Sequence, residues 1–265
     1  MSNPNNRMFE EFLRFVDKIA PTWFVFENVY GLTKFKNGEE NIQNHIENRF
    51  RHIGYTVKSK ILYASDFGVP QRRNRLFIVG NRNGIDFEFP KEFDYSVSVD
   101  EAISDLPVLE NGEIQMKGEY TVPFEQASPY AQLMRLKSKA PTQNIVSRNK
   151  DYVVERYKYI GQGENWSSIP DHLMGNYADK KRCHSGIYKR LIGSKPSVVI
   201  SNYRKSMLIH PHQDRGLSVR EAARLQSFPD DFIFEGPVSY VQQQIGNAVP
   251  PLLAKAVMKK ILTYK

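Results

Sequence analysis

A carboxylate and an amide stand side by side near the start of the 265-residue chain. Glu27 and Asn28 follow the apolar run Trp23–Phe26, which is typical of a buried strand. Ligands of open α/β sheets meet the carboxyl ends of strands. Burial favours the neutral, proton-donating form of a carboxyl group, so this position suits a glutamate with a raised pKa. The alternative is a glutamate that caps a helix or forms an ion pair.

A run of arginines precedes a second apolar stretch. QRRNR (Gln71–Arg75) follows the turn Asp66–Pro70 and leads into the predicted strand Arg75–Gly80. A guanidinium offers hydrogen-bond donors in a fixed planar geometry that a lysine cannot match. Such a run can equally be a solvated face, in which an arginine pairs with a surface carboxylate.

Four short stretches carry a resemblance when they are taken together. They are ENV (Glu27–Val29), QRRNR (Gln71–Arg75), REAARLQSFP (Arg220–Pro229) and QIGNAVPP (Gln244–Pro251). In this order, with flanking text such as GVPQRRNRLFIVG, they resemble the DNA (cytosine-5) methyltransferase family over essentially the whole chain, apart from a variable middle. The resemblance implies transfer of a methyl group from S-adenosylmethionine to carbon 5 of cytosine in duplex DNA, with the target base flipped out of the stack.

The resemblance also implies roles for single residues. Glu27 would protonate ring nitrogen 3 of cytosine while a thiolate adds to carbon 6, and Arg75 would hold the exocyclic oxygen. Arg73 would help to orient the thiol loop and the target. Asn247 and Val249 would touch the methionine end of the cofactor, and a simple helix N-cap at Asn247 is compatible with that role. No metal ligand is implied.

Local patterns predict the elements that must position these residues. Helical spacing indicates a helix over Met8–Ile19 and another from about Glu39 to Ile53. Alternation indicates a strand over Tyr55–Tyr63 with its odd-numbered residues on one face. Three more helices are indicated by two capping boxes and an early proline, at Ser98 with Glu101, Ser218 with Glu221, and Pro251.

The last of these helices has a predicted buried stripe of Leu253, Val257 and Ile261. Arg220 and Arg224 lie in the stretch that resembles the family's bracing motif, so we expect them to be structural rather than catalytic.

The order of these elements predicts an α/β fold. Residues 1–80 read helix–strand–helix–strand–strand and lack the Gly-rich turn that opens a nucleotide-binding sheet. We therefore expect the second half of a Rossmann-like S-adenosylmethionine-dependent methyltransferase sheet, plus a small irregular, mostly β target-recognition domain. Residues 1–80 would be the C-terminal half of the catalytic domain and 81–215 the target-recognition domain. Residues 216–265 would hold a bracing helix and a C-terminal helix that returns to the catalytic domain.

Composition points to a polyanion partner and to the cytoplasm. The net charge is +8 and the sequence pI is near 9.4, which favours a nucleic-acid partner. The single cysteine, Cys183, excludes an internal disulfide and fits a reducing compartment. The chain shows neither a basic-then-apolar signal pattern nor an apolar run long enough for a membrane span.

Basic and aromatic residues gather in Lys180–Leu191 and Ser201–Ser206. They are either a solvated surface or a set of phosphate contacts with an occasional stacking side chain. The candidate DNA-binding residues are Arg182, Lys189, Arg190, Arg204 and Lys205.

Part of the family's machinery has no counterpart in these 265 residues. The Gly-rich cofactor turn, the acidic residue for the cofactor ribose and the Pro-Cys-Gln loop are missing, and Cys183 lies in KKRCHSG without that proline or glutamine. We therefore expect a split or truncated enzyme, inactive until an N-terminal methyltransferase subunit supplies the cysteine, with an exposed apolar sheet edge. The alternative is a non-catalytic DNA-binding remnant. A cognate restriction endonuclease in the same restriction-modification system is left open.

Overall fold

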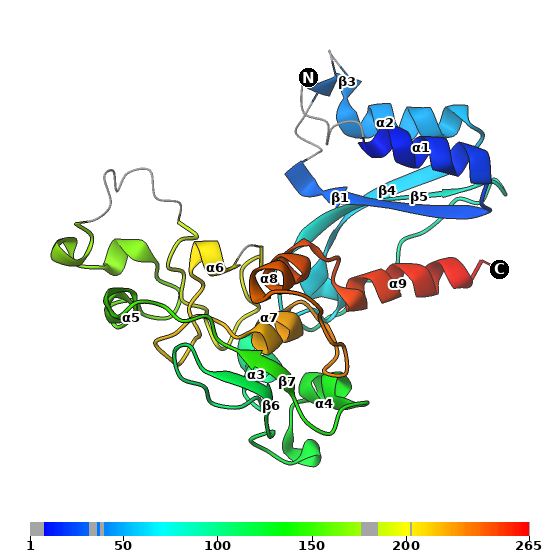
Figure 1. Ribbon diagram of the computed structural model, residues 1–265. Coiled ribbons are helices and arrows are strands. Elements are labelled where there is room, and N and C mark those ends of the chain that lie inside the picture. The colour runs from blue at the N-terminus through cyan, green and yellow to red at the C-terminus, as the bar shows by residue number, and fades with distance from the viewer. Residues whose placement is uncertain (1–7, 32–35, 38–39, 176–184, 202, 265) are drawn as a thin grey trace. The chain divides into compact units, whose positions relative to one another are not determined.

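The computed structural model describes residues 8–31, 36–37, 40–175, 185–201 and 203–264. Contacts divide the chain into two units (Figure 1), which are described separately. Unit 1 comprises residues 1–63, 74–92 and 256–265, and unit 2 comprises residues 64–73 and 93–255. These units cut across the predicted ranges 1–80, 81–215 and 216–265, which as functional domains stay predictions.

The centre of unit 1 is a three-stranded sheet in the order β1–β5–β4. These strands are Trp23–Val29 (β1), Asn74–Asn81 (β5) and Thr56–Tyr63 (β4), and β5 pairs antiparallel with both neighbours. β1 continues past the predicted end at Phe26. Glu27 therefore lies inside the strand, two residues before its end.

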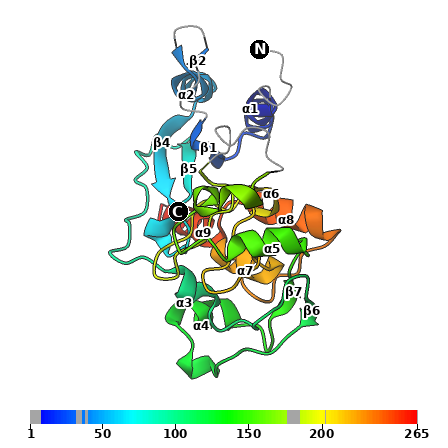
Figure 2. The same ribbon diagram turned by 90° about the vertical axis from the view of Figure 1, so that its left-hand side faces the viewer.

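Two helices cover one face of this sheet (Figure 1), namely α1 (Met8–Ile19) and α2 (Ile42–His52). A short ladder of β2 (Lys36–Asn37) and β3 (Glu40–Asn41) lies beside α2 (Figure 2). The Asn41 side chain caps α2 by accepting a hydrogen bond from the backbone N–H of Gln43.

The core between the helices and the sheet is rich in aromatic side chains. It contains Leu13, Val16, Phe24, Phe26, Ile46, Phe50, Tyr55, Val57, Leu76 and Ile78. Most of the predicted apolar faces of α1 and α2 are confirmed, but Met8 and Ile19 at the two ends of α1 are exposed. Because side chains alternate along a strand, Phe24 and Phe26 face the helices whereas Trp23 and Glu27 point to the opposite face.

The opposite face of the sheet is also partly covered. The ring of Trp23 contacts the rings of Phe87 and Tyr264, and Tyr264 follows α9 (Pro251–Leu262). The predicted start of this helix at Pro251 is confirmed. Its predicted stripe is confirmed as well, since Leu253, Val257 and Ile261 are buried.

The strand predicted over Tyr55–Tyr63 is confirmed as β4, which begins one residue later, at Thr56. At the other end of β4, Tyr63 is 52% exposed, whereas Leu62 is 1% exposed. The two-residue period itself is intact. Leu62 lies opposite Arg75 in the ladder, on the face away from Val57, and this end of the sheet is buried on that face too.

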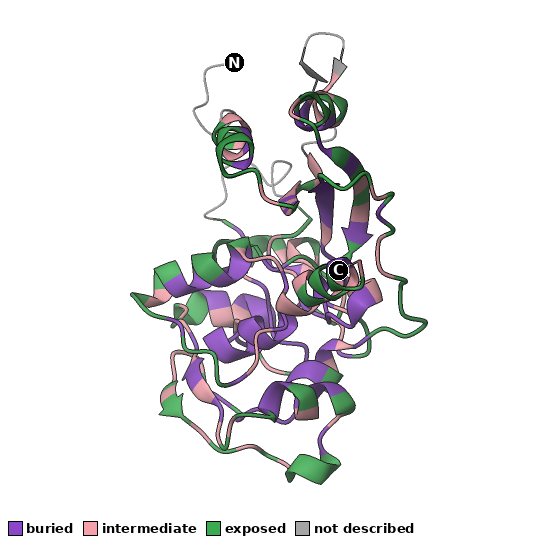
Figure 3. Ribbon diagram, turned by 90° about the vertical axis from the view of Figure 1, so that its right-hand side faces the viewer, coloured by how far each residue is buried: buried purple, intermediate pink, exposed green. Residues whose placement is uncertain are grey.

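Unit 2 consists of short helices joined by long irregular segments. The helices are α3 (Val99–Ile103), α4 (Pro129–Arg135), α5 (Asp151–Tyr157), α6 (Tyr203–Ser206), α7 (Val219–Leu225) and α8 (Val238–Asn247). Single 3-10 turns occur at Ala64–Phe67, Phe124–Gln126, Trp166–Ser168 and Asp171–Leu173. Every residue of α7 is buried, and buried segments surround it (Figure 3, purple). Both predicted capping boxes are confirmed, at α3 and at α7.

The expectation of a mostly β recognition domain was wrong for the described part of residues 81–215. After β5, the only named ladder in that part joins β6 (Ile114–Lys117) to β7 (Thr142–Ile145). The physical reason is that buried arginines, rather than neighbouring strands, satisfy many loop carbonyls. Arg220 donates to the carbonyls of Thr142, Pro229 and Phe232.

Arg224 is the centre of a buried ion cluster. Its guanidinium bonds the carboxylates of Asp105 and Asp230, and both ion pairs lie almost entirely out of solvent. It also donates to the Ala102 carbonyl, while the hydroxyl of Tyr120 donates to Asp230. The predicted bracing role of Arg224 is therefore confirmed.

Replacing Arg224 by leucine is expected to destabilise unit 2 by about 3–5 kcal/mol, because it leaves the buried carboxylate of Asp230 without its cation. Asp105 then keeps only its longer contact with Arg135, at 3.4 Å. Denaturant unfolding monitored by tryptophan fluorescence and circular dichroism measures this loss. The control is Arg14→Leu, which removes an exposed ion pair with Glu11 and should change stability little. Equal effects of the two substitutions would contradict the assignment.

A buried histidine makes unit 2 sensitive to acid. The Nδ1 atom of His210 accepts the backbone N–H of His212, which requires that nitrogen to be unprotonated. Burial lowers the pKa of His210 from 6.5 to about 4, although the Glu221 carboxylate opposes the shift. For Glu221, burial alone raises the pKa, but the adjacent Arg215 guanidinium lowers it to about 2.

The free energy of unfolding should therefore fall between about pH 6.5 and pH 4. As the pH is lowered through this window, His210 becomes protonated in the unfolded chain but stays neutral in the folded chain, so the unfolded state is favoured. The interval from 6.5 to about 4 corresponds to roughly 3 kcal/mol, at about 1.4 kcal/mol per pH unit. Urea titrations at a series of pH values measure the slope. His210→Asn keeps an acceptor for His212 without a proton to bind, so it should flatten the slope; an unchanged slope would exclude His210 as its source.

Candidate active site

Glu27 and Arg75 form an ion pair on two neighbouring strands of unit 1. The Nε atom of Arg75 lies 2.8 Å from Oε1 of Glu27. In the β1–β5 ladder Glu27 lies opposite Phe77, and Arg75 lies opposite Val29. The two residues are therefore diagonal neighbours on one face, a distance that long side chains bridge. The register of β1 and β5 therefore brings together two residues that were both predicted to contact the target cytosine.

This pair is partly shielded from solvent. The side chain of Arg75 is 11% exposed and that of Glu27 is 27% exposed. Burial lowers the pKa of Arg75, while the charge and hydrogen bond of Glu27 oppose the shift. Arg75 also donates to the carbonyl of Asn74. Glu27 is thus less buried than the predicted strand end implied, and it forms an ion pair, which is the alternative that the sequence left open.

Arg73 occupies a different setting, inside unit 2. Its side chain is 1% exposed. One terminal nitrogen donates to the carbonyl of Ile200 at 2.9 Å, and the other donates to the carbonyl of Gly246 at 2.8 Å. These contacts are with backbone segments of the same unit, so Arg73 has the surroundings of a residue that fixes loops in place.

Gln71 extends this arrangement, and no role was predicted for it. Its amide nitrogen donates to Leu225 O and to the side-chain oxygen of Gln226, and its oxygen accepts the N–H of Ile200. Gln226 in turn donates to the carbonyl of Ala248. The signal available in the sequence was the position of Gln71 at the head of QRRNR, next to a proline.

The proposed cofactor contacts flank this anchored carbonyl. Asn247 is the last residue of α8 and is exposed, and Val249 is half-buried in the turn before α9. Asn247 therefore ends a helix and does not begin one, so the alternative role as an N-cap was wrong. The hydrogen bond from Gln226 to the carbonyl of Ala248 holds the backbone between Asn247 and Val249. The exposed amide of Asn247 suits the polar end of a methionine group, and the side chain of Val249 suits its aliphatic part.

The candidate DNA contacts differ sharply in exposure. Arg204 and Lys205 on α6 are exposed, and Lys189 is half-buried with its ammonium group bonded to the Gly163 carbonyl. Arg190 is buried, and its guanidinium bonds four carbonyls, those of Tyr157, Ile160, His210 and Gln213, and the Asp214 carboxylate. This setting speaks against a phosphate contact by Arg190, because its donors are used within unit 2.

Two further residues from the sequence predictions, Arg182 and Cys183, lie outside the described residues.

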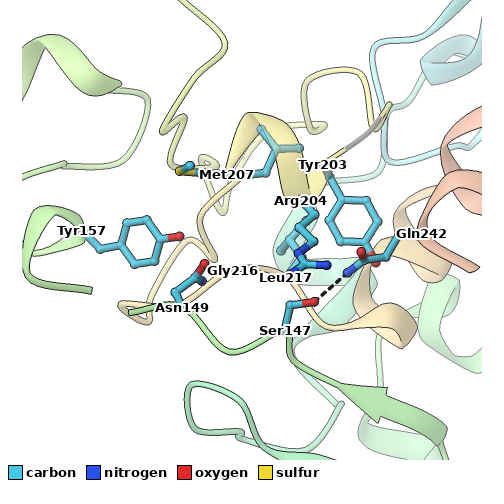
Figure 4. Close-up of a pocket in the computed structure, with 10 residues that line it drawn as sticks. Ser147, Asn149, Tyr157, Tyr203, Arg204, Met207, Gly216, Leu217 and Gln242 are labelled. Carbon is cyan, nitrogen blue, oxygen red and sulfur yellow. Dashed lines mark hydrogen bonds between the residues drawn. The ribbon is translucent and has the colours of Figure 1, made fainter. Parts of the chain in front are cut away.

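A small cavity in unit 2 lies beneath α6 (Figure 4). Its lining includes Ser147, Tyr157, Tyr203 and Gln242, and Gln242 donates to the Ser147 hydroxyl at 2.9 Å. The cavity measures about 20 Å³, which is room for about one water molecule. It is too small for a base or for a cofactor.

Within the described ranges, no three histidine, cysteine or acidic side chains are grouped as metal ligands would be. None of the helices in those ranges has both the length and the apolar character needed to cross a membrane.

Comparison with known proteins identifies the fold. The chain resembles a solved prophage-encoded DNA modification methyltransferase of E. coli with a TM-score of 0.74, covering 97% of this chain and 74% of that one at 24% identity. At this identity the likeness shows a mixed α/β methyltransferase fold.

Comparison of sequences goes further. The chain is 35% identical over 262 residues to Type II methyltransferase M1.HphI of Haemophilus parahaemolyticus, covering 98% of this chain and 62% of the relative. It is 34% identical over 284 residues to M.DdeI of Desulfomicrobium norvegicum, covering 99% of this chain and 68% of the relative. The chain thus spans roughly two thirds of the length of these relatives. Residues 1–263 match the family model of the C-5 cytosine-specific DNA methylases, and the chain belongs to that family.

Proposed function

We propose that this chain polarises a flipped cytosine and reads the target in S-adenosylmethionine-dependent methylation of duplex DNA at carbon 5. The observation that carries the proposal is the 2.8 Å pair of Glu27 and Arg75 on adjacent strands, in a chain of the cytosine methylase family. Relatives named Type II methyltransferases support a place in a restriction-modification system, with a cytoplasmic location and a cognate endonuclease as further parts of the proposal.

The proposed chemistry divides between Glu27 and Arg75. A thiolate forms a bond to carbon 6 of the cytosine, electron density moves toward ring nitrogen 3, and a protonated Glu27 gives that nitrogen its proton. Carbon 5 then has enamine character and can accept a methyl group. Loss of the carbon-5 proton, release of the thiolate from carbon 6 and return of the nitrogen-3 proton to Glu27 then restore the aromatic ring. Arg75 holds the exocyclic oxygen of the ring through its fixed donors. It also orients Glu27 through the contact that the structure already contains.

The proposal assigns the remaining machinery to sequence outside these 265 residues. S-adenosylmethionine supplies the methyl group when it is bound, and Asn247 and Val249 are the residues of this chain that would contact its methionine end. The nucleophile would come from a Pro-Cys-Gln loop, which we place on a separate N-terminal subunit. Among the described residues of unit 1, β1 has a ladder partner on one side only, β5, and its last residue, Val29, is 52% exposed. This edge could accept a strand of that subunit.

The 265-residue chain alone is expected to transfer no methyl group. Adding a polypeptide with the Gly-rich turn and the Pro-Cys-Gln loop, for example the product of a reading frame immediately upstream, should restore transfer. Incorporation of tritiated methyl groups into genomic DNA measures this. Robust transfer by the chain alone would refute the split arrangement. DNA binding without transfer by the complemented pair would favour the alternative, a non-catalytic DNA-binding remnant.

Glu27→Gln should lower transfer by the complemented enzyme about 10²–10⁴-fold, because an amide keeps the shape of the side chain but has no acidic proton to give. Glu11→Gln, a change at an exposed glutamate of α1, is the control and should leave transfer unchanged. Binding of duplex DNA should survive both substitutions. Equal transfer by the Glu27→Gln and Glu11→Gln proteins would sink the assigned role.

A further inference from the structure

The segment Ser197–Ser201 of unit 2 is anchored at its start by backbone pairing. The N–H of Ser197 donates to the carbonyl of Pro70, and its carbonyl accepts the N–H of Arg72, both at 2.9 Å. Ser197 is 2% exposed. The start of the segment is thereby tied to the QRRNR stretch.

Buried side chains fix the other end of the segment. The N–H of Ile200 donates to the side-chain oxygen of Gln71, and its carbonyl accepts a terminal nitrogen of Arg73, again both at 2.9 Å. Gln71 and Ile200 are 0% exposed, and Arg73 is 1% exposed. A buried guanidinium and a buried amide bonded in this way leave the backbone of the segment little freedom.

The end of the segment also packs closely against α8, which is a third constraint on its backbone. The second terminal nitrogen of Arg73 donates to the carbonyl of Gly246. A Cβ atom on Gly246 would lie 2.1 Å from the carbonyl oxygen of Ser201. The backbone of Ser201 therefore packs where any side chain at position 246 would be.

Between these anchors the segment exposes two valines. Val198 is 36% exposed and Val199 is 42% exposed. The exposed cations Arg204 and Lys205 follow shortly afterwards on α6. In protein–DNA interfaces, apolar side chains contact thymine methyl groups in the major groove, while cations on nearby elements hold phosphates.

We propose that Gln71 and Arg73 are positioning residues that lock Ser197–Ser201 against the last turn of α8, so that Val198 and Val199 contact base edges of the target duplex. This inference rests on the proposed function, because it takes duplex DNA as the partner. It names the part of the chain that would touch the bases, and it gives Gly246 its reason to lack a side chain.

Fluorescence anisotropy with a duplex library that has a random 20-base-pair centre tests the proposal without any methyl transfer. The double substitution Val198→Ser with Val199→Ser is on the surface, so it should not disturb folding. We expect it to weaken binding about tenfold by removing apolar contact. The slope of log affinity against log salt should stay unchanged, because no phosphate contact is lost.

Matched variants separate contact from positioning. Val108→Ser alters an exposed valine elsewhere in unit 2 and should leave binding unchanged, whereas Arg204→Ala should reduce the salt slope by about one.

Gly246→Ala should reproduce the loss of the double valine variant by displacing Ser201. Gly216→Ala should not, because its Cβ would meet only ordinary contacts at 3.7 and 3.8 Å. Likewise Arg73→Lys should weaken binding, and Arg72→Lys, at an exposed neighbour, should not.

Two results would overturn the inference, and they are distinguishable. If the wild-type chain binds the library but the double valine variant binds equally well, the segment does not contact bases and the proposed function stands. If the wild-type chain binds no duplex at all, the proposed DNA target fails and the inference fails with it.

Discussion

The register between β1 and β5 is the constraint on which the candidate site depends. A strand presents alternate residues to opposite faces, so a slip of one residue would send Glu27 or Arg75 to the face that packs on α1 and α2. The register is held by what lies on that face, where Phe24 and Phe26 are buried beside Ile78. Phe24 packs closely over Gly80, where a Cβ atom would lie 2.1 Å from its ring. An aromatic core on one side of the sheet thus sets the geometry of an ion pair on the other.

Unit 2 buries irregular backbone, whose polar groups need hydrogen-bond partners. Its loops have few ladder partners, so their carbonyls are satisfied by guanidinium groups reaching in from elsewhere, as Arg190 and Arg220 do. One guanidinium can bond several carbonyls from separate segments, which a strand cannot do. This explains why segments far apart in the sequence, such as those around Gln71, Ile200 and Gly246, are held together without a continuous sheet.

The sequence predicted what local patterns control. Capping boxes at Ser98 and Ser218 and the proline at 251 located helix starts correctly, because each acts within one turn. The motifs named Glu27 and Arg75, but their pairing depends on register, which no local pattern contains. Arg190 was predicted to contact DNA, because charge alone does not tell whether carbonyls surround a guanidinium. The expectation of a mostly β domain over residues 81–215 was wrong for the same reason, since an irregular sequence does not show which groups will bond its backbone.

The buried arginines change how the basic character of the chain should be understood. Denaturing isoelectric focusing would count every arginine equally, and the sequence pI near 9.4 does the same. Among the described residues, however, buried arginines outnumber buried carboxylates. Part of the positive charge therefore serves to hold backbone segments together inside the protein. These guanidinium groups already donate to carbonyls and carboxylates inside the protein, so they cannot also contact a polyanion. Direct contacts with phosphates are therefore limited to lysines and arginines at the surface, whose number the pI does not report.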